Sequence, residues 1–140
     1  MLIADNLAII LKTCYREPKD INDYKFFCFN GRVELLKVDF DRSVNHRANY
    51  YDRDFNLLDF GEEAYLPDLE KKISRPGRLE TMITLAEKIA CDKKFVRVDL
   101  YEVDGKVFFG ENTFYPASAS GRFVPGSADH ELGKLLKLPE

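Results

Sequence analysis

Alternating apolar and polar positions predict two β-hairpins. The first comprises the β-rich runs 24–29 and 32–40, which flank Asn30-Gly31. Asn-Gly between such runs is a strong hairpin signal, because both residues of a two-residue turn need a positive φ. The second hairpin comprises the runs 95–103 and 107–114 around Asp104-Gly105.

Apolar residues at helical spacing predict a main helix over 77–91, with Ser74 and Pro76 marking its start. Its apolar stripe is expected to face the core. A short C-terminal helix is expected over about 130–138, with His130 in its first turn. Residues 1–10 are expected to form a strand, with a short helix as the alternative.

Two segments are expected to be irregular. The polar and aromatic segment 41–75 and the stretch 121–129 are predicted to be loops. The predicted order is β-β-β, loop, α, β-β, α in a single domain over 1–140. This is an α+β arrangement, in which two antiparallel hairpins form a mixed or antiparallel sheet packed by one main helix and a short C-terminal helix.

Composition narrows the class of protein. The chain has 140 residues, 45% hydrophobic residues and a net charge of -3, typical of one globular domain and without the basic excess of a nucleic-acid binder. No apolar run reaches the ~20 residues of a membrane span, and the start shows no signal peptide. Cys14, Cys28 and Cys91 fit neither a disulfide framework nor a zinc site; they favour a reducing cytoplasm and positions as buried thiols.

The second hairpin carries the candidate chemistry, and its register decides whether a site exists. A two-residue turn would pair Val98 with Glu111 and send Asp99 and Glu111 to opposite faces. A three-residue turn would place Arg97, Asp99 and Glu111 on one face together with Thr113, and we prefer it because it separates polar from apolar groups. A bulge at Gly110 is an alternative route to the same face.

Two carboxylates on one face indicate a hard-cation site. Mg²⁺ prefers oxygen ligands and is often held by one or two carboxylates together with substrate phosphates. Two carboxylates this close would repel one another unless a cation lay between them. Taken alone, however, the local pattern is more often that of an amphipathic hairpin with a solvated Arg97–Asp99 pair.

Several strings together resemble the ATP-grasp superfamily, specifically its TupA-like branch, associated with teichuronopeptide and other bacterial surface-polymer biosynthesis. They are DYKFFCFNG (23–31), VDFDR (38–42), NYYDRDFN (49–56), FVRVDLYEVDGKVFFGENTFYP (95–116) and LGKLLKLP (132–139). The resemblance covers about residues 20–139. It implies that ATP binds between two α+β subdomains and phosphorylates a carboxylate to an acylphosphate, which an amine or another nucleophile attacks.

Carried over residue by residue, the resemblance implies roles for the second hairpin. Asp99 and Glu111 resemble the Mg²⁺ carboxylates, and Arg97 resembles the cation that faces the transferred phosphate. Thr113 stands where many relatives place a third metal-side ligand, usually asparagine. Asn112 is adjacent, and a shift of one residue would let it serve instead.

The front of the chain departs from the pattern. The strand that contacts adenine usually carries two glutamates and an aromatic residue, whereas Ala4-Asp5-Asn6 occupies that place here, so Asp5 is its only carboxylate. The N-terminal subdomain of the resembling proteins and a Gly-rich phosphate loop are not found in the sequence. The chain is therefore expected to be the C-terminal half of an ATP-grasp domain. It would be a fragment, a chain completed by a separate polypeptide, or an inactive protein.

Outside the second hairpin, four residues carry side chains that a site could use. Lys25 could line the nucleotide cleft, but an exposed strand lysine is the commoner interpretation. Arg42 is a candidate clamp for a carboxylate or phosphate, with a surface ion pair to Asp39 or Asp41 as the alternative. His46 and His130 have no partner at metal or catalytic spacing, and neither is assigned to a functional site.

Three functions follow from these observations. The first is a Mg²⁺-ATP-dependent carboxylate ligase half domain that acts on a carboxylate or surface-polymer precursor. The second is a truncated, inactive fragment that keeps the fold and at most weak metal or nucleotide binding. The third, a glycan- or protein-binding domain, has only the aromatic loop 49–60 in its favour.

Overall fold

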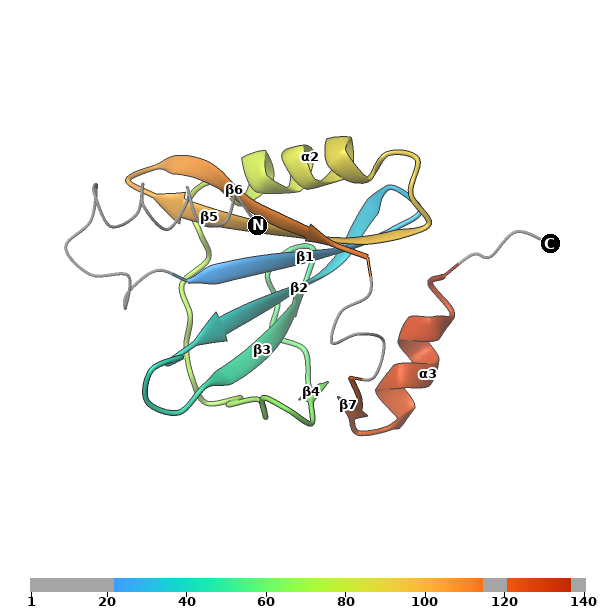
Figure 1. The fold of residues 1–140 in the computed structure, drawn as a ribbon. Coiled ribbons are helices and arrows are strands. Elements are labelled where there is room, and N and C mark those ends of the chain that lie inside the picture. Colours follow the sequence, from blue (N-terminus) through green and yellow to red (C-terminus); the bar gives the residue numbers. More distant parts are fainter. Residues whose placement is uncertain (1–21, 115–120, 137–140) are drawn as a thin grey trace.

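The computed structural model describes residues 22–114 and 121–136, and in them a five-stranded antiparallel sheet is the central element. Its strand order is β3-β2-β1-β5-β6. The strands are β1 (Asp23–Phe29), β2 (Arg32–Phe40), β3 (Arg47–Asp52), β5 (Phe95–Val103) and β6 (Lys106–Thr113). The two predicted hairpins are β1–β2 and β5–β6, and they join through the antiparallel pair β1–β5 (Figure 1). The α+β class is confirmed.

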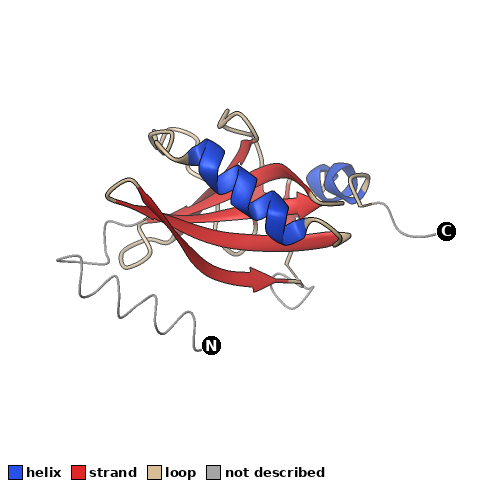
Figure 2. Cartoon of the chain, turned by 90° about the horizontal axis from the view of Figure 1, so that it is seen from above, coloured by secondary structure: helices blue, strands red, loops and turns tan. Residues whose placement is uncertain are grey.

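Helix α2 (Leu79–Ala90) covers one face of this sheet, as Figure 2 shows from above. Its predicted apolar stripe is confirmed: Leu79, Met82, Ile83, Ala86 and Ala90 are buried. They pack against the apolar side chains that β1, β2 and β5 direct to the same face, such as Phe26, Leu36 and Val98. Each such side chain contributes about 1.5–3 kcal/mol when it is fully buried, so this face holds the main core.

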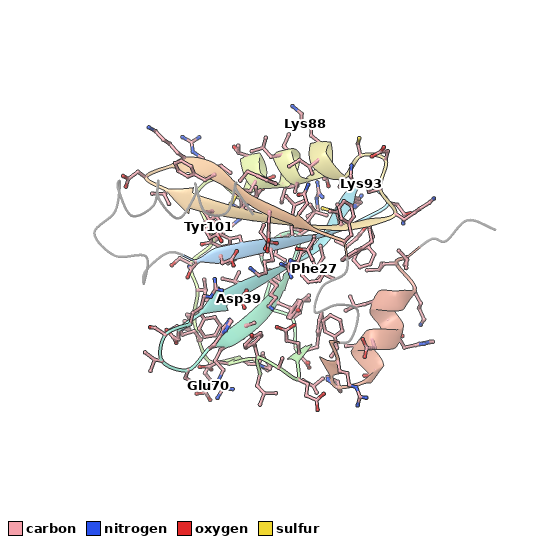
Figure 3. All side chains as sticks on the ribbon, in the orientation of Figure 1. Phe27, Asp39, Glu70, Lys88, Lys93 and Tyr101 are labelled. Atoms are coloured by element: carbon pink, nitrogen blue, oxygen red, sulfur yellow. The ribbon has the colours of Figure 1, made fainter. Side chains whose placement is uncertain are left out.

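The opposite face carries a smaller apolar cluster and a set of charged residues. Phe27, Leu35 and Tyr50 form the centre of the cluster. The small sheet β4 (Gly61–Glu62) and β7 (Phe123–Val124) and the short helix α3 (Ser127–Gly133) lie over it. Phe123 of β7 and Leu132 of α3 pack against it, together with Phe60 just before β4 and Leu135 just after α3. In Figure 3, Phe27 and Asp39 lie in the sheet, away from α2, while Lys88 extends from the outer side of the helix.

Three expectations about the loops and the last helix were wrong. The segment 41–75 is not wholly irregular, because β3 pairs with β2 and β4 pairs with β7. Strand β7 and the start of α3 likewise fall in the expected loop 121–129. Since α3 begins at Ser127, His130 lies in its last turn and not in its first. The predicted strand 1–10, Asp5 and Cys14 lie outside the described residues.

The register of the second hairpin corrects the expected turn. Val103 pairs with Lys106, so Asp104-Gly105 is a two-residue turn, and both residues have the positive φ that such a turn requires (51° and 69°). The register then shifts by one residue between Leu100, which pairs with Phe109, and Asp99, which pairs with Glu111. The additional residue is Gly110, at the alternative bulge position that the sequence suggested.

A matching shift occurs in the first hairpin. Phe29 pairs with Arg32 across the predicted Asn-Gly turn, but Phe27 pairs with Leu35 and Lys25 pairs with Lys37. Without this shift Lys25 would lie opposite Leu36. The two shifts therefore bring the polar residues of β1, β2, β5 and β6 to the face opposite α2, while the apolar residues stay in the main core.

Prediction for the bulge. We expect Gly110→Ala to destabilise the fold by about 1–3 kcal/mol, because overpacking of a closely packed position has costs of this size. A Cβ atom at residue 110 would lie 2.8 Å from Cε2 of Tyr101 and 3.1 Å from the carbonyl oxygen of Asp99. The free energy of unfolding from urea denaturation measures the effect.

Gly133→Ala is the matched control for the bulge prediction. A Cβ atom there has nothing within 4 Å, so the variant should be neutral or slightly more stable. Equal stability of the Gly110 variant and the wild type would contradict a bulge closed against Tyr101.

Candidate functional site

Arg97, Asp99 and Glu111 lie together on the sheet face opposite α2. Arg97 binds Asp99 with two parallel hydrogen bonds, Nε to Oδ1 at 2.8 Å and Nη2 to Oδ2 at 2.9 Å. Its Nη2 also lies 3.5 Å from Oε1 of Glu111 and donates to Oγ1 of Thr113 at 3.2 Å. The guanidinium group thus stands between the two carboxylates, and the solvated Arg97–Asp99 pair is ruled out because Asp99 is 2% exposed.

The bulge determines which residue of β6 faces this site. Thr113 pairs with Arg97 and Glu111 pairs with Asp99, so both point to the polar face. Asn112 pairs with Val98 and therefore points to the face of α2. Of the two alternatives for a third metal-side ligand, the structure places Thr113 beside the carboxylates and Asn112 on the other side of the sheet.

Lys25 is buried, and the expectation that it would be an exposed strand lysine was wrong. It is 8% exposed and forms an ion pair with Asp23. Its Nζ also lies 3.4 Å from Asp39 and 3.3 Å from Asp99. Burial acts to lower the pKa of Lys25, but the three carboxylates outweigh it and raise that pKa. The ammonium is therefore kept charged and acts as an internal counter-ion.

The aspartates around Lys25 are not equivalent. Burial raises the pKa of Asp23, and the nearby Asp99 and Asp39 add to the effect while Lys25 opposes it. Asp23 Oδ1 is also the buried side-chain atom that has no hydrogen-bond partner in the described part of the chain. Burial would raise the pKa of Asp39 as well, but Lys37, Lys25 and His46 outweigh it and lower that pKa. Of Asp23 and Asp39, Asp39 is therefore the carboxylate that stays ionised.

Arg42 and His46 come from the connection between β2 and β3. Nη1 of Arg42 lies 3.3 Å from Oδ2 of Asp23, and the arginine side chain is 58% exposed. Arg42 thus forms an ion pair, but the expected partners Asp39 and Asp41 were wrong, because the carboxylate that it contacts is Asp23 of β1. His46 Nε2 lies 2.8 Å from Oδ1 of Asp39, and its ring stacks on Tyr65.

A cavity of about 610 Å³ lies over the face opposite α2. Of the residues described above, it is lined by Lys25, Asp39, Arg42, His46, Arg97 and Glu111, whereas Asp99 and Thr113 do not line it. One part is charged and includes Lys25, Lys37, Arg97, Glu111 and His46. The other part is apolar and is lined by Phe27 and Phe95 of the main sheet, Phe123 of β7, Leu132 of α3 and Leu136 just after α3. The volume falls in the range of small-molecule and cofactor sites, about 300–1,000 Å³.

Sequence reasoning missed His46, Lys37, Glu62 and Tyr65 as residues of this cavity. Lys37 forms ion pairs with Asp39 and Glu62, and its Nζ lies 5.2 Å from the centre of the Tyr65 ring. The alternation of β2 places Lys37 and Asp39 on one face with Lys25, which was a usable signal. His46, Glu62 and Tyr65 reach the cavity only through the path of the segment between β2 and α2, and no local pattern indicates that path.

The donor set at Asp99 and Glu111 fits a hard cation in part. Two carboxylates and a hydroxyl group on neighbouring strands are oxygen donors of the kind that Mg²⁺ binds. The Glu111 side chain is 56% exposed, and its Oε1 lies 3.5 Å from Nη2 of Arg97, so it is weakly held. Asp99, however, already gives both oxygens to Arg97. Within the described residues, no three His, Cys, Asp or Glu side chains are grouped closely enough to hold a metal ion without further ligands.

Two further expectations concern the cysteines and the membrane. Cys28 is buried as predicted, and burial raises the pKa of its thiol to about 12. The expected burial of Cys91 was wrong, because this residue is exposed just after the end of α2. Both are free thiols. In the part of the chain that the structure describes, no helix has the length and apolar character needed to cross a bilayer.

Comparison with known proteins identifies the family. The family model described as TupA-like ATPgrasp matches residues 5–137, which is nearly the whole chain. The chain therefore belongs to the TupA-like ATP-grasp family, as the motifs indicated, and this membership points to ATP as a ligand. No curated protein and no solved structure gives a significant match.

Prediction for the aspartates. The lowered pKa of Asp39 means that its charge stabilises the fold above the ordinary value of 3.8, and this contribution is lost as the pH falls through the lowered pKa. The raised pKa of Asp23 means the reverse: its contribution is present below 3.8 and is lost as the pH rises through the raised pKa. At pH 7, Asp39→Asn should lower the free energy of unfolding by about 1–3 kcal/mol, the cost of weakening a buried charged hydrogen bond.

The pH dependence separates the two variants. Relative to the wild type, Asp39→Asn should become less stable as the pH rises from 3 to 7, and Asp23→Asn should become more stable. Urea denaturation at several pH values in this range measures both differences. Slopes of the same sign would contradict the different roles of the two carboxylates.

Proposed function

We propose that this chain binds Mg²⁺-ATP in the cavity opposite α2 and supplies the metal-binding part of a carboxylate ligase that works through an acylphosphate. The observation that carries the proposal is the cross-strand pair Asp99–Glu111, with Arg97 between them; Arg97 and Glu111 line the charged end of a 610 Å³ cavity. Membership of an ATP-grasp family supports ATP as the nucleotide.

The two parts of the cavity suit the two parts of a nucleotide. The apolar part, around Phe27, Phe95 and Phe123, offers aromatic faces and edges for a base. The charged part offers Arg97 for the phosphates. Because the polar groups of the phosphates and the apolar surface of the base need opposite surroundings, this division favours one orientation of the ligand.

Asp99, Glu111 and Thr113 are the residues that would hold the metal ion. When bound, Mg²⁺ would neutralise phosphate charge, which is the main requirement of phosphoryl transfer. Glu111 can turn toward an ion, since its carboxylate is mostly exposed and weakly held. Asp99 would share its oxygens between the ion and Arg97, and burial keeps its carboxylate fixed for both.

Arg97, Arg42 and Lys25 have distinct supporting roles in this proposal. Arg97 is charged over the whole accessible pH range, because Asp99 outweighs the effect of burial and raises its pKa. It would face the transferred phosphoryl group. Arg42 has an exposed side chain at the rim of the cavity and would clamp a carboxylate or phosphate. Lys25 would contribute only its positive charge from below the ligand, since its ammonium already forms ion pairs with Asp23, Asp39 and Asp99.

Family resemblance supports the finer parts of the proposal. We place the reaction in bacterial surface-polymer biosynthesis, such as that of teichuronopeptide, in the cytoplasm, with a carboxylate or polymer precursor as substrate. Residues 1–140 would form the C-terminal subdomain, with Asp5 near the adenine, and a further segment or separate polypeptide would cover the phosphates. The exposure of Glu111 at the edge strand β6 is in keeping with such a cover.

The second candidate function is a family member that keeps the fold but does not catalyse. The observation in its favour is that both carboxylate oxygens of Asp99 accept hydrogen bonds from Arg97, while Lys25 lies 3.3 Å from one of them. In such a protein Arg97 would permanently replace the metal ion as the counter-charge, and nucleotide binding would be weak at most.

Prediction for nucleotide binding. We expect Mg²⁺-ATP to bind the wild type and to bind Glu111→Gln and Asp99→Asn at least tenfold more weakly, because each variant removes one carboxylate charge from the metal ion. Isothermal titration calorimetry with and without Mg²⁺ measures the affinities. Glu111→Gln is the sharper variant, since its exposed side chain can change without cost to folding.

Asn112→Ala is the matched control for this titration. Its side chain lies one residue away on the opposite face of the sheet, so the variant should bind as the wild type does. No binding by the wild type would favour the inactive family member. Equal loss in the Asn112 and Glu111 variants would contradict the assigned metal position.

A further inference from the structure

His46 is held in a defined orientation at the end of the cavity that lies over β2. Its Nε2 is 2.8 Å from Oδ1 of Asp39, and its ring stacks on Tyr65 with a centroid distance of 3.8 Å and an angle of 30°. The histidine side chain is 21% exposed and lines the cavity. The proposed nucleotide site uses none of these contacts.

Asp39 determines which ring nitrogen carries the proton. The aspartate is 2% exposed, and Lys37 and Lys25 hold its charge at 3.5 Å and 3.4 Å. An ionised carboxylate can only accept a hydrogen bond, so Nε2 must be the nitrogen that donates. In the neutral ring the lone pair is then on Nδ1, for which the described residues provide no hydrogen-bond partner.

His46 lines the same cavity as Arg97 and Glu111, which leaves room for a substrate between them. Asp39 is on β2 and Asp99 is on β5, with β1 between them. Adjacent strands are about 4.8 Å apart, so the backbones of the two aspartates are roughly 10 Å apart across the sheet. Their carboxylates are closer, because Nζ of Lys25 lies between them, 3.4 Å from Asp39 and 3.3 Å from Asp99. A small acyl group could lie between a phosphate at Arg97 and a nucleophile at His46.

We propose that His46 accepts a proton at Nδ1 from an amine or hydroxyl nucleophile that attacks the acylphosphate, with Asp39 and Tyr65 as its positioning residues. This inference rests on the proposed function. The nucleophile forms a bond to the acyl carbon, the bond from that carbon to the phosphate oxygen breaks, and inorganic phosphate leaves with the electron pair. The proton passes from the nucleophile to Nδ1 and is later released to solvent.

The groups that face the ring support a proton acceptor at this place. Asp39 from β2 stabilises the imidazolium that forms, and Lys37 from the same strand is itself paired with Asp39 and with Glu62 of β4. Tyr65 stacks on one side of the ring and, with the contact to Asp39, holds its orientation. The ring can therefore gain a proton without a change of position, as proton transfer in a defined geometry requires.

The first test is the tautomer of His46 in the wild-type protein, measured by long-range ¹H–¹⁵N correlation of the imidazole rings at alkaline pH. The sequence has two histidines, and exposed His130 on α3 is the internal control. We expect His46 to be held as the Nε2–H tautomer, while His130 gives the averaged signals of a solvated ring. A Nδ1–H tautomer, or averaging at His46, would overturn the proposal.

The second test is the access of Nδ1 to small molecules. Diethyl pyrocarbonate reacts with unprotonated imidazole nitrogens, and peptide mass spectrometry gives its rate at each histidine. His46 is less exposed than His130, but we expect it to react within about threefold of the rate of His130, because its side chain lines the cavity and Nε2 is the nitrogen bound to Asp39. An unreactive His46 would overturn the proposal. Neither test involves nucleotide, so failure here is separate from failure of Mg²⁺-ATP binding.

Discussion

The register shift at Gly110 is the constraint on which the rest of the site depends. The two-residue turn at Asp104-Gly105 fixes the pairing at the closed end of the hairpin, and without an additional residue Glu111 would pair with Val98 and face α2. The bulge turns Glu111 toward Asp99 and brings Thr113 beside Arg97. It also requires a residue without a side chain, because Tyr101 and the backbone of Asp99 fill the space where a Cβ atom would lie.

Charged residues replace a second apolar core on the face that the bulge completes. Asp23, Lys25, Asp39 and Asp99 are almost fully buried there, and each charge has an opposite charge within contact distance. Replacing such a network by apolar residues often stabilises a protein, so its presence is weak evidence for stability and better evidence for a site. The aromatic cluster around Phe27 and Tyr50 closes the other end and gives the cavity its apolar wall.

Much of the sheet was predictable because its signals are local. Asn30-Gly31 and Asp104-Gly105 identify both hairpins, and helical spacing identifies α2. The predicted three-residue turn at Asp104-Gly105 was wrong. The separation of polar from apolar faces indicates that the register of the hairpin shifts, but it does not indicate where. A bulge at Gly110 gives the same separation as a longer turn. Strand β3 was missed because its pairing with β2 follows from burial of Tyr50 and Tyr51 on opposite faces of the sheet, which a polar and aromatic segment does not reveal. The burial of Lys25 and the placement of His46 depend on contacts between distant segments, and local patterns carry no such information.

The central claim is that Asp99 and Glu111 hold one divalent ion between neighbouring strands. Its most direct measurement is paramagnetic broadening of backbone amide signals on addition of Mn²⁺ and ADP to ¹⁵N-labelled protein, because the effect falls steeply with distance from the ion. The account predicts broadening that is strongest at Asp99 and Glu111, weaker at β1, and smallest along α2 on the far side of the sheet. Broadening centred elsewhere, or equal along β6 and α2, would contradict it.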